Sequence, residues 1–177
     1  MGSVSMGNGD IIGILDLTLL DRGASEEELI RLCERAVAHR VAAVCVFSEH
    51  VRFVRGLLPE EVKVASVVGG FPVGWRDPTK VSKAISEAID FGADEIDCVL
   101  EPTPNGGVSS KEDLQILSAM RDACGEKTLK VIIETPLMDE HSIRATSRLA
   151  MASGADFVKT CTGKRGDCTD EDARILS

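Results

Sequence analysis

The sequence is poor in aromatic residues, which make up 3% of its 177 residues and include no Tyr and a single Trp. Bases of single-stranded nucleic acids stack on aromatic side chains, so this scarcity argues against such a binding surface. Positive charge is also scarce, because 20 Lys and Arg stand against 29 Asp and Glu, a net charge of −9. A protein that binds a phosphate backbone needs a basic patch. We therefore expect no nucleic-acid partner.

Long hydrophobic runs are missing as well. No run approaches the roughly 18 apolar residues of a membrane-spanning helix, so we expect no membrane partner. Residues 1–6 lack the charged and apolar regions of a secretory signal, and we interpret residues 1–9 as a flexible leader or an expression scar. The six cysteines form no C-x-x-C pair and have no His at zinc spacing. This pattern favours reduced thiols in a cytoplasmic protein without a metal site.

What the sequence does contain is an alternation of short β-branched runs with longer amphipathic runs. Ser25 and Glu28 form a capping box at the start of the first long helix. Strands that are apolar on both faces and alternate with helices are typical of a parallel sheet covered by helices. The expected strands are Ile11–Leu15, Ala42–Phe47, Lys63–Val68, Glu95–Val99, Lys130–Ile133 and Phe157–Lys159. The expected later helices are Glu49–Leu57, Thr79–Phe91, Lys111–Cys124 and His141–Ser153, with a last one beginning near Thr169.

A weak internal repeat relates the fourth and sixth expected strands. Gly92-Ala93-Asp94 and Gly154-Ala155-Asp156 each precede a strand, and the glycine is typical of a helix C-terminus. Aligning the two places Asp97 and Lys159 at the same step, and a looser match of the second strand places Cys45 there too. In an eight-stranded barrel, side chains from alternate strands share an interior layer. We therefore expect these three residues to face one another inside a barrel.

The spacing of the strands predicts the size of that barrel. Each βα unit takes about 29 residues, and eight such units approach the roughly 250 residues of a TIM barrel. The 177 residues hold about six units. The expected fold is thus α/β, a TIM (β/α)8-type barrel with only about six βα units present. Residues 10–177 would form one barrel domain that is incomplete at its C-terminus.

Lys159 is the first candidate for chemistry, because it ends a buried apolar strand and Lys is rarely buried without a partner. One interpretation is an ion-paired or snorkelling lysine. The other is a Schiff-base nucleophile whose pKa is lowered toward 7–8 by desolvation and by a nearby cation such as Lys130. Asp97 either balances a buried lysine or shuttles protons for that chemistry. Asp16, at the end of the first strand, is by itself typical of a turn or helix cap.

The segment Thr160-Cys161-Thr162-Gly163-Lys164 follows Lys159 directly. Hydroxyls, a glycine and a lysine in a loop between strand and helix can form a cradle for an oxyanion or a phosphate. The segment lacks the full P-loop spacing, so its motif alone does not define a phosphate site.

Six segments together resemble the 2-deoxyribose-5-phosphate aldolases. They are Leu15–Leu20, Ala43–Val46, Gly70–Pro72, Gly92–Asp97, Leu129–Thr135 and Gly154–Lys164, in that order along the chain. The resemblance implies a TIM-barrel class I aldolase that needs neither a metal nor another cofactor. Such enzymes reversibly cleave 2-deoxyribose 5-phosphate to acetaldehyde and glyceraldehyde 3-phosphate. The implied partner is a small phosphorylated sugar or aldehyde, and the chain could also form a homo-oligomer.

The same resemblance implies a role for particular residues. Lys159 matches the Schiff-base lysine, Asp97 the proton-relaying aspartate, and Lys130 a lysine of the active-site network. The implied supporting and substrate-binding residues are Asp16 and Thr18 at the first strand, Cys45 near the substrate, and Thr162, Gly163 and Lys164 around the substrate hydroxyl and phosphate.

The sequence departs from the family at three places. Cys161 stands where the family usually has Ser, and residues 100–107 are unlike the family's loop after the fourth strand. Strands seven and eight, which would bring a second active-site lysine and phosphate-binding loops, are not in the sequence. Two alternatives remain: a non-catalytic barrel relative that acts as a binding or scaffold protein, and a Schiff-base aldolase for another phosphorylated sugar.

Overall fold

The computed structural model describes residues 11–103 and 111–176, so the expected leader, residues 1–9, lies outside the described residues. Six parallel strands form one sheet in the order β1-β2-β3-β4-β5-β6. The strands are β1 (Asp16–Leu19), β2 (Ala43–Phe47), β3 (Lys63–Val68), β4 (Glu95–Val99), β5 (Thr128–Ile132) and β6 (Phe157–Lys159). The helices are α2 (Glu26–His39), α3 (Ser48–Arg55), α4 (Pro78–Asp90), α5 (Lys111–Cys124), the 3₁₀ turn η1 (Thr135–Leu137), α6 (Glu140–Ala152) and α7 (Asp170–Leu176).

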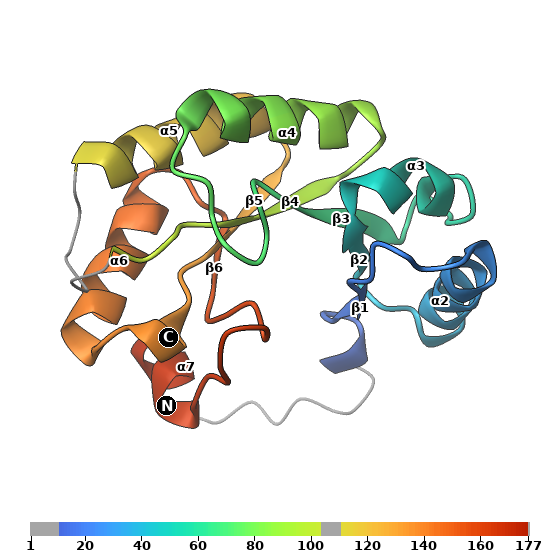
Figure 1. Cartoon of the computed structure of the whole chain (residues 1–177). Helices are drawn as coiled ribbons and strands as arrows, with labels where there is room; N and C mark the ends of the chain where they lie inside the picture. The colour runs from blue at the N-terminus through green and yellow to red at the C-terminus, as the bar shows by residue number, and fades with distance from the viewer. Residues whose placement is uncertain (1–10, 104–110, 177) are drawn as a thin grey trace.

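The sheet curls, with β1 and β6 as its two edges and helices α2 to α6 around its outer side (Figure 1). This is the arrangement of six βα units in a partial TIM barrel, as the sequence predicted. None of the helices in the described ranges combines the length and the hydrophobicity of a membrane span.

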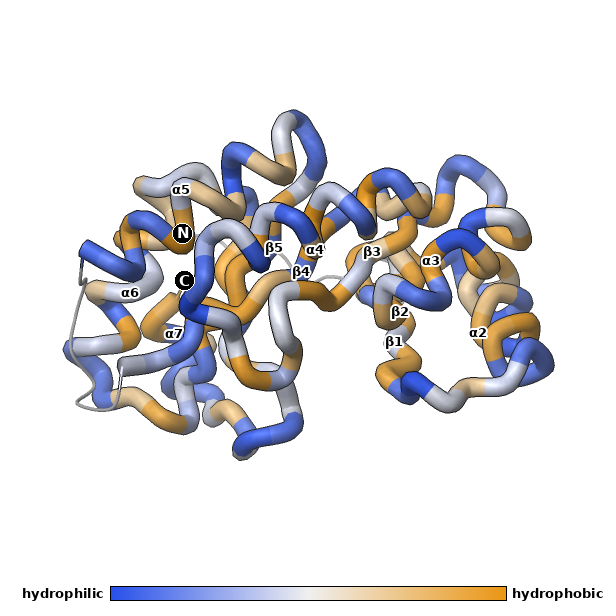
Figure 2. Tube along the Cα trace, turned by 45° about the horizontal axis from the view of Figure 1, so that its top comes forward, coloured by the Kyte–Doolittle hydropathy of each residue, from blue (hydrophilic) through white to orange (hydrophobic). Residues whose placement is uncertain are grey.

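Alternation along each strand divides the core into an outer and an inner layer. On β2, Val44 and Val46 pack outward against the helices, whereas Ala43, Cys45 and Phe47 pack inward. Figure 2 shows the same division along the chain, with hydrophobic strands at the centre and hydrophilic turns of helix outside. The inner layer is small, and it leaves the remaining inward positions of β1, β4, β5 and β6 to polar side chains.

The first long helix forms as its sequence predicts. Ser25 caps α2, with its side chain accepting a hydrogen bond from the Glu28 amide at 3.3 Å while Glu28 accepts from the Ser25 amide at 2.8 Å. Residues at helical spacing form the buried face of α2 against the sheet: Leu29, Leu32, Cys33 and Ala36.

The expected first strand, Ile11–Leu15, is wrong. Residues 11 and 12 are helical, and the amides of Ile14 and Leu15 donate to the carbonyls of Ile11 and Ile12 at 3.1 and 3.2 Å. The strand begins at Asp16, because pairing with β2 starts where Asp16 lies beside Ala43. The apolar run therefore precedes the strand, and the strand itself turns Asp16 inward. The expected strand Lys130–Ile133 also begins earlier than predicted, at Thr128.

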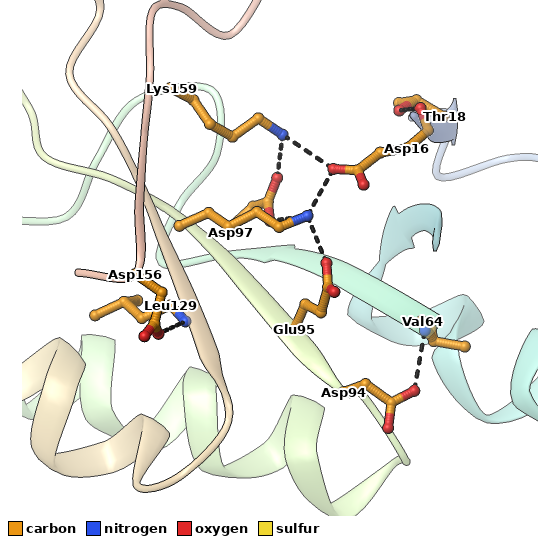
Figure 3. A network of polar contacts seen from close by, with 10 residues as sticks. Asp16, Thr18, Val64, Asp94, Glu95, Asp97, Leu129, Asp156 and Lys159 are labelled. Atoms are coloured by element: carbon orange, nitrogen blue, oxygen red, sulfur yellow. Dashed lines mark hydrogen bonds and ion pairs between the residues drawn. The ribbon is translucent and has the colours of Figure 1, made fainter. Parts of the chain in front are cut away.

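The internal repeat found in the sequence corresponds to a repeated structural device. Gly92 follows the end of α4 with φ of 105°, a conformation that favours glycine, and a Cβ there would lie 3.1 Å from the Arg55 side chain. Asp94 Oδ2 accepts a hydrogen bond from the Val64 amide at 3.0 Å (Figure 3) and another from Arg55 Nη1 at 2.9 Å. The Gly-Ala-Asp sequence thus ties helix, turn and neighbouring strand together at the amino ends of the strands.

The second copy of the repeat provides a test of this role. Asp156 Oδ2 accepts from the Leu129 amide at 2.8 Å and from Arg121 Nη1 at 3.0 Å. The Leu129 amide, followed by Arg121, holds the pKa of Asp156 below its usual value. We expect Asp156→Asn to lower the free energy of unfolding by about 1 kcal/mol at pH 7, a modest loss because the side chain is 48% exposed and the ion pair is screened.

The pH dependence has a definite sign. A carboxylate with a lowered folded-state pKa stabilises fully above its unfolded pKa of about 4, and this stabilisation is lost as pH falls through the folded pKa. Urea denaturation at pH 7 and pH 3 should therefore show the difference between wild type and Asp156→Asn shrinking at the lower pH. The exposed Glu126→Gln serves as the control and should match wild type at both. An equal difference at both pH values would contradict the assignment.

Candidate active site

Lys159, at the end of β6, reaches into a group of carboxylates on the inner side of the sheet (Figure 3). Its Nζ donates a hydrogen bond to Asp97 Oδ2 and lies 3.6 Å from Asp16 Oδ2. Asp97 comes from β4 and Asp16 from β1, so the contact with Asp16 joins the two edge strands of the curled sheet. Lys159 and Asp16, which are 159 − 16 = 143 positions apart in the sequence, are thereby brought into contact.

Lys130 on β5 forms the second positive centre. Its Nζ lies 2.7 Å from Asp16 Oδ2, 2.5 Å from Glu95 Oε2 and 3.9 Å from Asp97 Oδ1. Asp97 pairs with Lys130 in the register of β4 and β5, and Glu95 lies two positions before Asp97 on the same face of β4. Three carboxylates thus surround two ammonium groups, and we call these five residues the lysine–carboxylate cluster.

Burial makes this cluster electrostatically unusual. The Asp97 side chain is 0% exposed, and its Oδ1 has no hydrogen-bond partner among the residues that the structure describes. Burial raises the pKa of Asp97, and the two lysines only partly oppose this. Asp97 is therefore a carboxyl group that accepts a proton more readily than an ordinary aspartate.

The expected lowering of the Lys159 pKa is wrong for this structure. Burial by itself lowers the pKa of Lys159, but the Asp97 carboxylate and its hydrogen bond outweigh burial, so the pKa lies above the usual value. Lys130 does not act as the predicted depressing cation, because Asp16 and Glu95 balance its charge at close range. The pKa of Lys130 itself is raised in spite of its burial, first by the Asp97 charge and then by the hydrogen bonds to Asp16 and Glu95.

Cys45 and Thr18 border the cluster. Cys45 is buried, and burial raises the pKa of its thiol to about 12, with Asp97, Lys159 and Asp16 among the charges that act on it. The thiol is therefore neutral near pH 7 and forms part of the inner wall. Thr18 is exposed beside Asp16, and its hydroxyl donates to the Asp16 carbonyl at 3.1 Å. The alternate-strand residues Cys45, Asp97 and Lys159 thus share the inner side of the sheet.

The predicted substrate-binding residues after β6 lie outside the lysine–carboxylate cluster. Thr162 donates through its hydroxyl to Glu134 Oε2 at 2.8 Å, and Gly163 makes a turn with φ of 66°. Lys164 is exposed, and its amide donates to Thr162 Oγ1 at 3.2 Å. A cavity of about 350 Å³ is lined by charged and apolar residues, among them Ile14, Asp16, Glu95, Lys130, Phe157 and Lys159.

A sequence model described as DeoC/LacD family aldolase matches residues 11–177. The chain belongs to this family. It is 36% identical over 173 residues to the deoxyribose-phosphate aldolase of Halalkalibacterium halodurans, covering 94% of this chain and 75% of that protein. The deoxyribose-phosphate aldolase of Ureaplasma urealyticum serovar 10 is 38% identical over 151 residues, 84% of this chain and 69% of that protein. The tetrameric deoxyribose phosphate aldolase from Aeropyrum pernix matches with a TM-score of 0.81 at 26% identity, covering 95% of this chain and 71% of that one.

Membership in this family makes the chain a carbon–carbon lyase of the aldolase type. In this aldolase the structure adds residues that the sequence did not single out. Glu95 could have been found from its i, i+2 relation to Asp97 on β4, which puts both on one face of the strand. Glu134 gave no such signal, because it follows β5 in an irregular turn.

A further ion pair crosses the loops of this aldolase. Arg165 Nη1 and Nη2 contact Glu101 Oε2 and Oε1 at 2.7 and 2.9 Å, and the Gly74 amide donates to Glu101 Oε2 at 3.1 Å. Glu101 lies in the segment that departs from the family pattern. The loops after β3, β4 and β6 are therefore connected by contacts that no single segment predicts.

Proposed function

We propose that the chain is a deoxyribose-phosphate aldolase that reversibly cleaves 2-deoxyribose 5-phosphate to acetaldehyde and glyceraldehyde 3-phosphate through a Schiff base on Lys159. The observation that carries the proposal is the contact between the partly exposed Lys159 amine and the fully buried Asp97 carboxyl. The names of relatives in several bacteria support the choice of substrate.

The first step generates a free amine. Below its raised pKa Lys159 is an ammonium group, which has no lone pair for attack. Asp97 Oδ2, already hydrogen-bonded to Nζ, accepts the proton, and burial favours the neutral pair over separated charges. The amine then attacks C1 of the open-chain sugar and forms a carbinolamine. Asp97 returns the proton to the carbinolamine hydroxyl, which leaves as water and gives the protonated Schiff base.

The protonated Schiff base then draws electrons from the C2–C3 bond. Loss of the proton from the C3 hydroxyl breaks this bond, releases glyceraldehyde 3-phosphate and leaves an enamine on Lys159. Protonation of the enamine at C2, followed by hydrolysis, releases acetaldehyde and restores the amine. Asp97 and the Asp16 carboxylate, both beside Nζ, are the groups placed to move these protons. Lys130 holds Asp16 and Glu95 in place and offsets their charge.

The loop after β6 takes the phosphorylated end of the substrate in this proposal. Thr162 would meet a substrate hydroxyl, while Gly163 and the exposed Lys164 would meet the phosphate. The tetrameric relative supports a homo-oligomer. A cytoplasmic location fits the six free thiols, four of which are buried in the core.

The test is turnover with purified chain. We expect cleavage of 2-deoxyribose 5-phosphate, measured as acetaldehyde through NADH oxidation by alcohol dehydrogenase. Unphosphorylated 2-deoxyribose should react with kcat/KM at least about tenfold lower, because it forfeits the charge-assisted phosphate contacts. An aldolase for another phosphorylated sugar, the second candidate, is favoured by the Glu101–Arg165 pair, because Glu101 lies in the loop that departs from the family. Faster cleavage of a different sugar phosphate than of 2-deoxyribose 5-phosphate would favour this second candidate.

A further inference from the structure

Glu134 combines deep burial with an unusual backbone conformation. Its side chain is fully buried, and its φ and ψ are both 59°, in the left-handed region. Among the described residues other than glycine, only Arg40 also has a positive φ, and Arg40 is the ordinary C-cap of α2. Strained residues of this kind cluster at functional sites. Glu134 nevertheless has no place in the lysine–carboxylate cluster.

Both carboxylate oxygens of Glu134 are used by one residue of the loop after β6. The Thr162 amide donates to Oε1 at 3.1 Å, and the Thr162 hydroxyl donates to Oε2 at 2.8 Å. The neighbouring Thr135 amide donates to the Thr160 carbonyl at 2.8 Å. The turn after β5 therefore makes three hydrogen bonds to the loop after β6, and the first residue bound, Thr160, directly follows Lys159.

The hydrogen bond to Glu134 also orients the Thr162 hydroxyl. Its proton points to Glu134, and the Lys164 amide donates to the same oxygen at 3.2 Å. A hydroxyl oxygen accepts two hydrogen bonds, so one lone pair remains for a donor from outside the loop. The direction of that lone pair is set by the other two bonds.

We propose that Glu134 is a positioning residue, which fixes Thr162 and the following Lys164 so that they meet a hydroxyl and the phosphate of the sugar substrate. The inference rests on the proposed function. It assigns Glu134 to substrate binding rather than to the chemistry at Lys159. Removing the Glu134 charge should therefore raise KM for the phosphorylated sugar and leave the amine chemistry intact.

The experiment measures KM and kcat for 2-deoxyribose 5-phosphate in wild type, Glu134→Gln, Thr162→Val and the double variant. We expect KM to rise about tenfold in Glu134→Gln, with kcat changing less than about threefold, because a charge-assisted hydrogen bond to the loop is lost. Thr162→Val should behave alike, and the double variant should lose little more than the worse single variant. Trapping of acetaldehyde on Lys159 with borohydride should match wild type, because acetaldehyde has no hydroxyl or phosphate for the loop to hold.

Two controls separate positioning from stability. Asp94→Asn also removes a partly buried carboxylate contact, but at the amino ends of the strands, and should keep KM within about twofold of wild type. Thr162→Ser keeps the hydroxyl and should recover most of the affinity that Thr162→Val loses. If Glu134→Gln does not fold, Thr162→Val against Thr162→Ser tests the same hydrogen bond from the loop side.

The outcomes are distinct. Wild-type KM in Glu134→Gln and in Thr162→Val would overturn the inference and leave the proposed function standing. Parallel loss of kcat and of acetaldehyde trapping would assign Glu134 a structural role only and would also overturn it. Absence of turnover by wild type with the phosphorylated sugar would remove the proposed function and the inference together.

Discussion

Replacing Lys159 with Met should lower kcat for cleavage of 2-deoxyribose 5-phosphate by about 10⁴-fold or more, because no other amine can form the covalent intermediate in the same place. Lys130 is the other amine in the cluster, but Asp16 and Glu95 bind it at 2.7 and 2.5 Å and hold it protonated. Fixed-time assays at an enzyme concentration high enough to detect residual turnover measure this loss of kcat.

Lys164→Met is the matched control for that variant. Lys164 lies five residues further along the chain, is exposed, and takes no part in the lysine–carboxylate cluster. We expect its loss to raise KM by about tenfold or less while kcat is retained, since a single exposed charge on the phosphate is at stake. A comparable loss of kcat in both variants would contradict the assignment of Lys159 as the nucleophile and of Lys164 as a phosphate contact.

Asp97→Asn should reduce the rate of acetaldehyde adduct formation by about 10²- to 10³-fold near pH 7, because it removes the carboxylate that is hydrogen-bonded to Nζ and leaves only Asp16, which lies 3.6 Å away and is paired with Lys130, to take the proton of Lys159. The shape of the pH profile is the sharper readout. The pKa of Asp97 is raised by burial, and that of Lys159 is raised by Asp97 against its own burial. Between the two pKa values the pair holds one proton, and moving that proton from Nζ to Asp97 changes no net charge.

Wild type should therefore form the adduct at a rate that is nearly independent of pH across the neutral range. In Asp97→Asn the hydrogen-bonded acceptor is gone and Asp16 is already paired with Lys130, so the proton leaves to solvent and the rate should rise about tenfold per pH unit below the pKa of Lys159. Timed incubation with acetaldehyde, quenching with borohydride and mass spectrometry of the intact chain give the rate at each pH. A flat profile in the variant, or a slope of one in wild type, would contradict internal proton transfer.

Much of the fold follows from local sequence. Lys63–Val68, Glu95–Val99 and Phe157–Lys159 have the predicted bounds, because short β-branched runs between capped helices leave little choice of register. The prediction of the first strand is wrong, because there the apolar run and the strand do not coincide. Ile11–Leu15 is apolar enough to predict a strand, but β1 is decided by pairing with Ala43, which the apolar pattern does not contain.

The site was predictable where strand periodicity determines it. The alternate-strand alignment places Cys45, Asp97 and Lys159 on the inner side, where the structure has them. What escaped the sequence are interactions across the fold. The direction of the Lys159 pKa depends on how three carboxylates from β1 and β4 share two lysines. The hydrogen bond between Thr162 and Glu134 depends on where the turn after β5 contacts the loop after β6.

The central claim is that Lys159 is the nucleophile of the site, and the most direct test is to locate the covalent adduct. Purified chain incubated with acetaldehyde and reduced with borohydride should gain one ethyl group, the mass of the reduced Schiff base. Peptide mapping should place that group on Lys159 and leave Lys130, two strand positions away across the β5–β6 pair, unmodified. An ethyl group mainly on Lys130 would contradict the account.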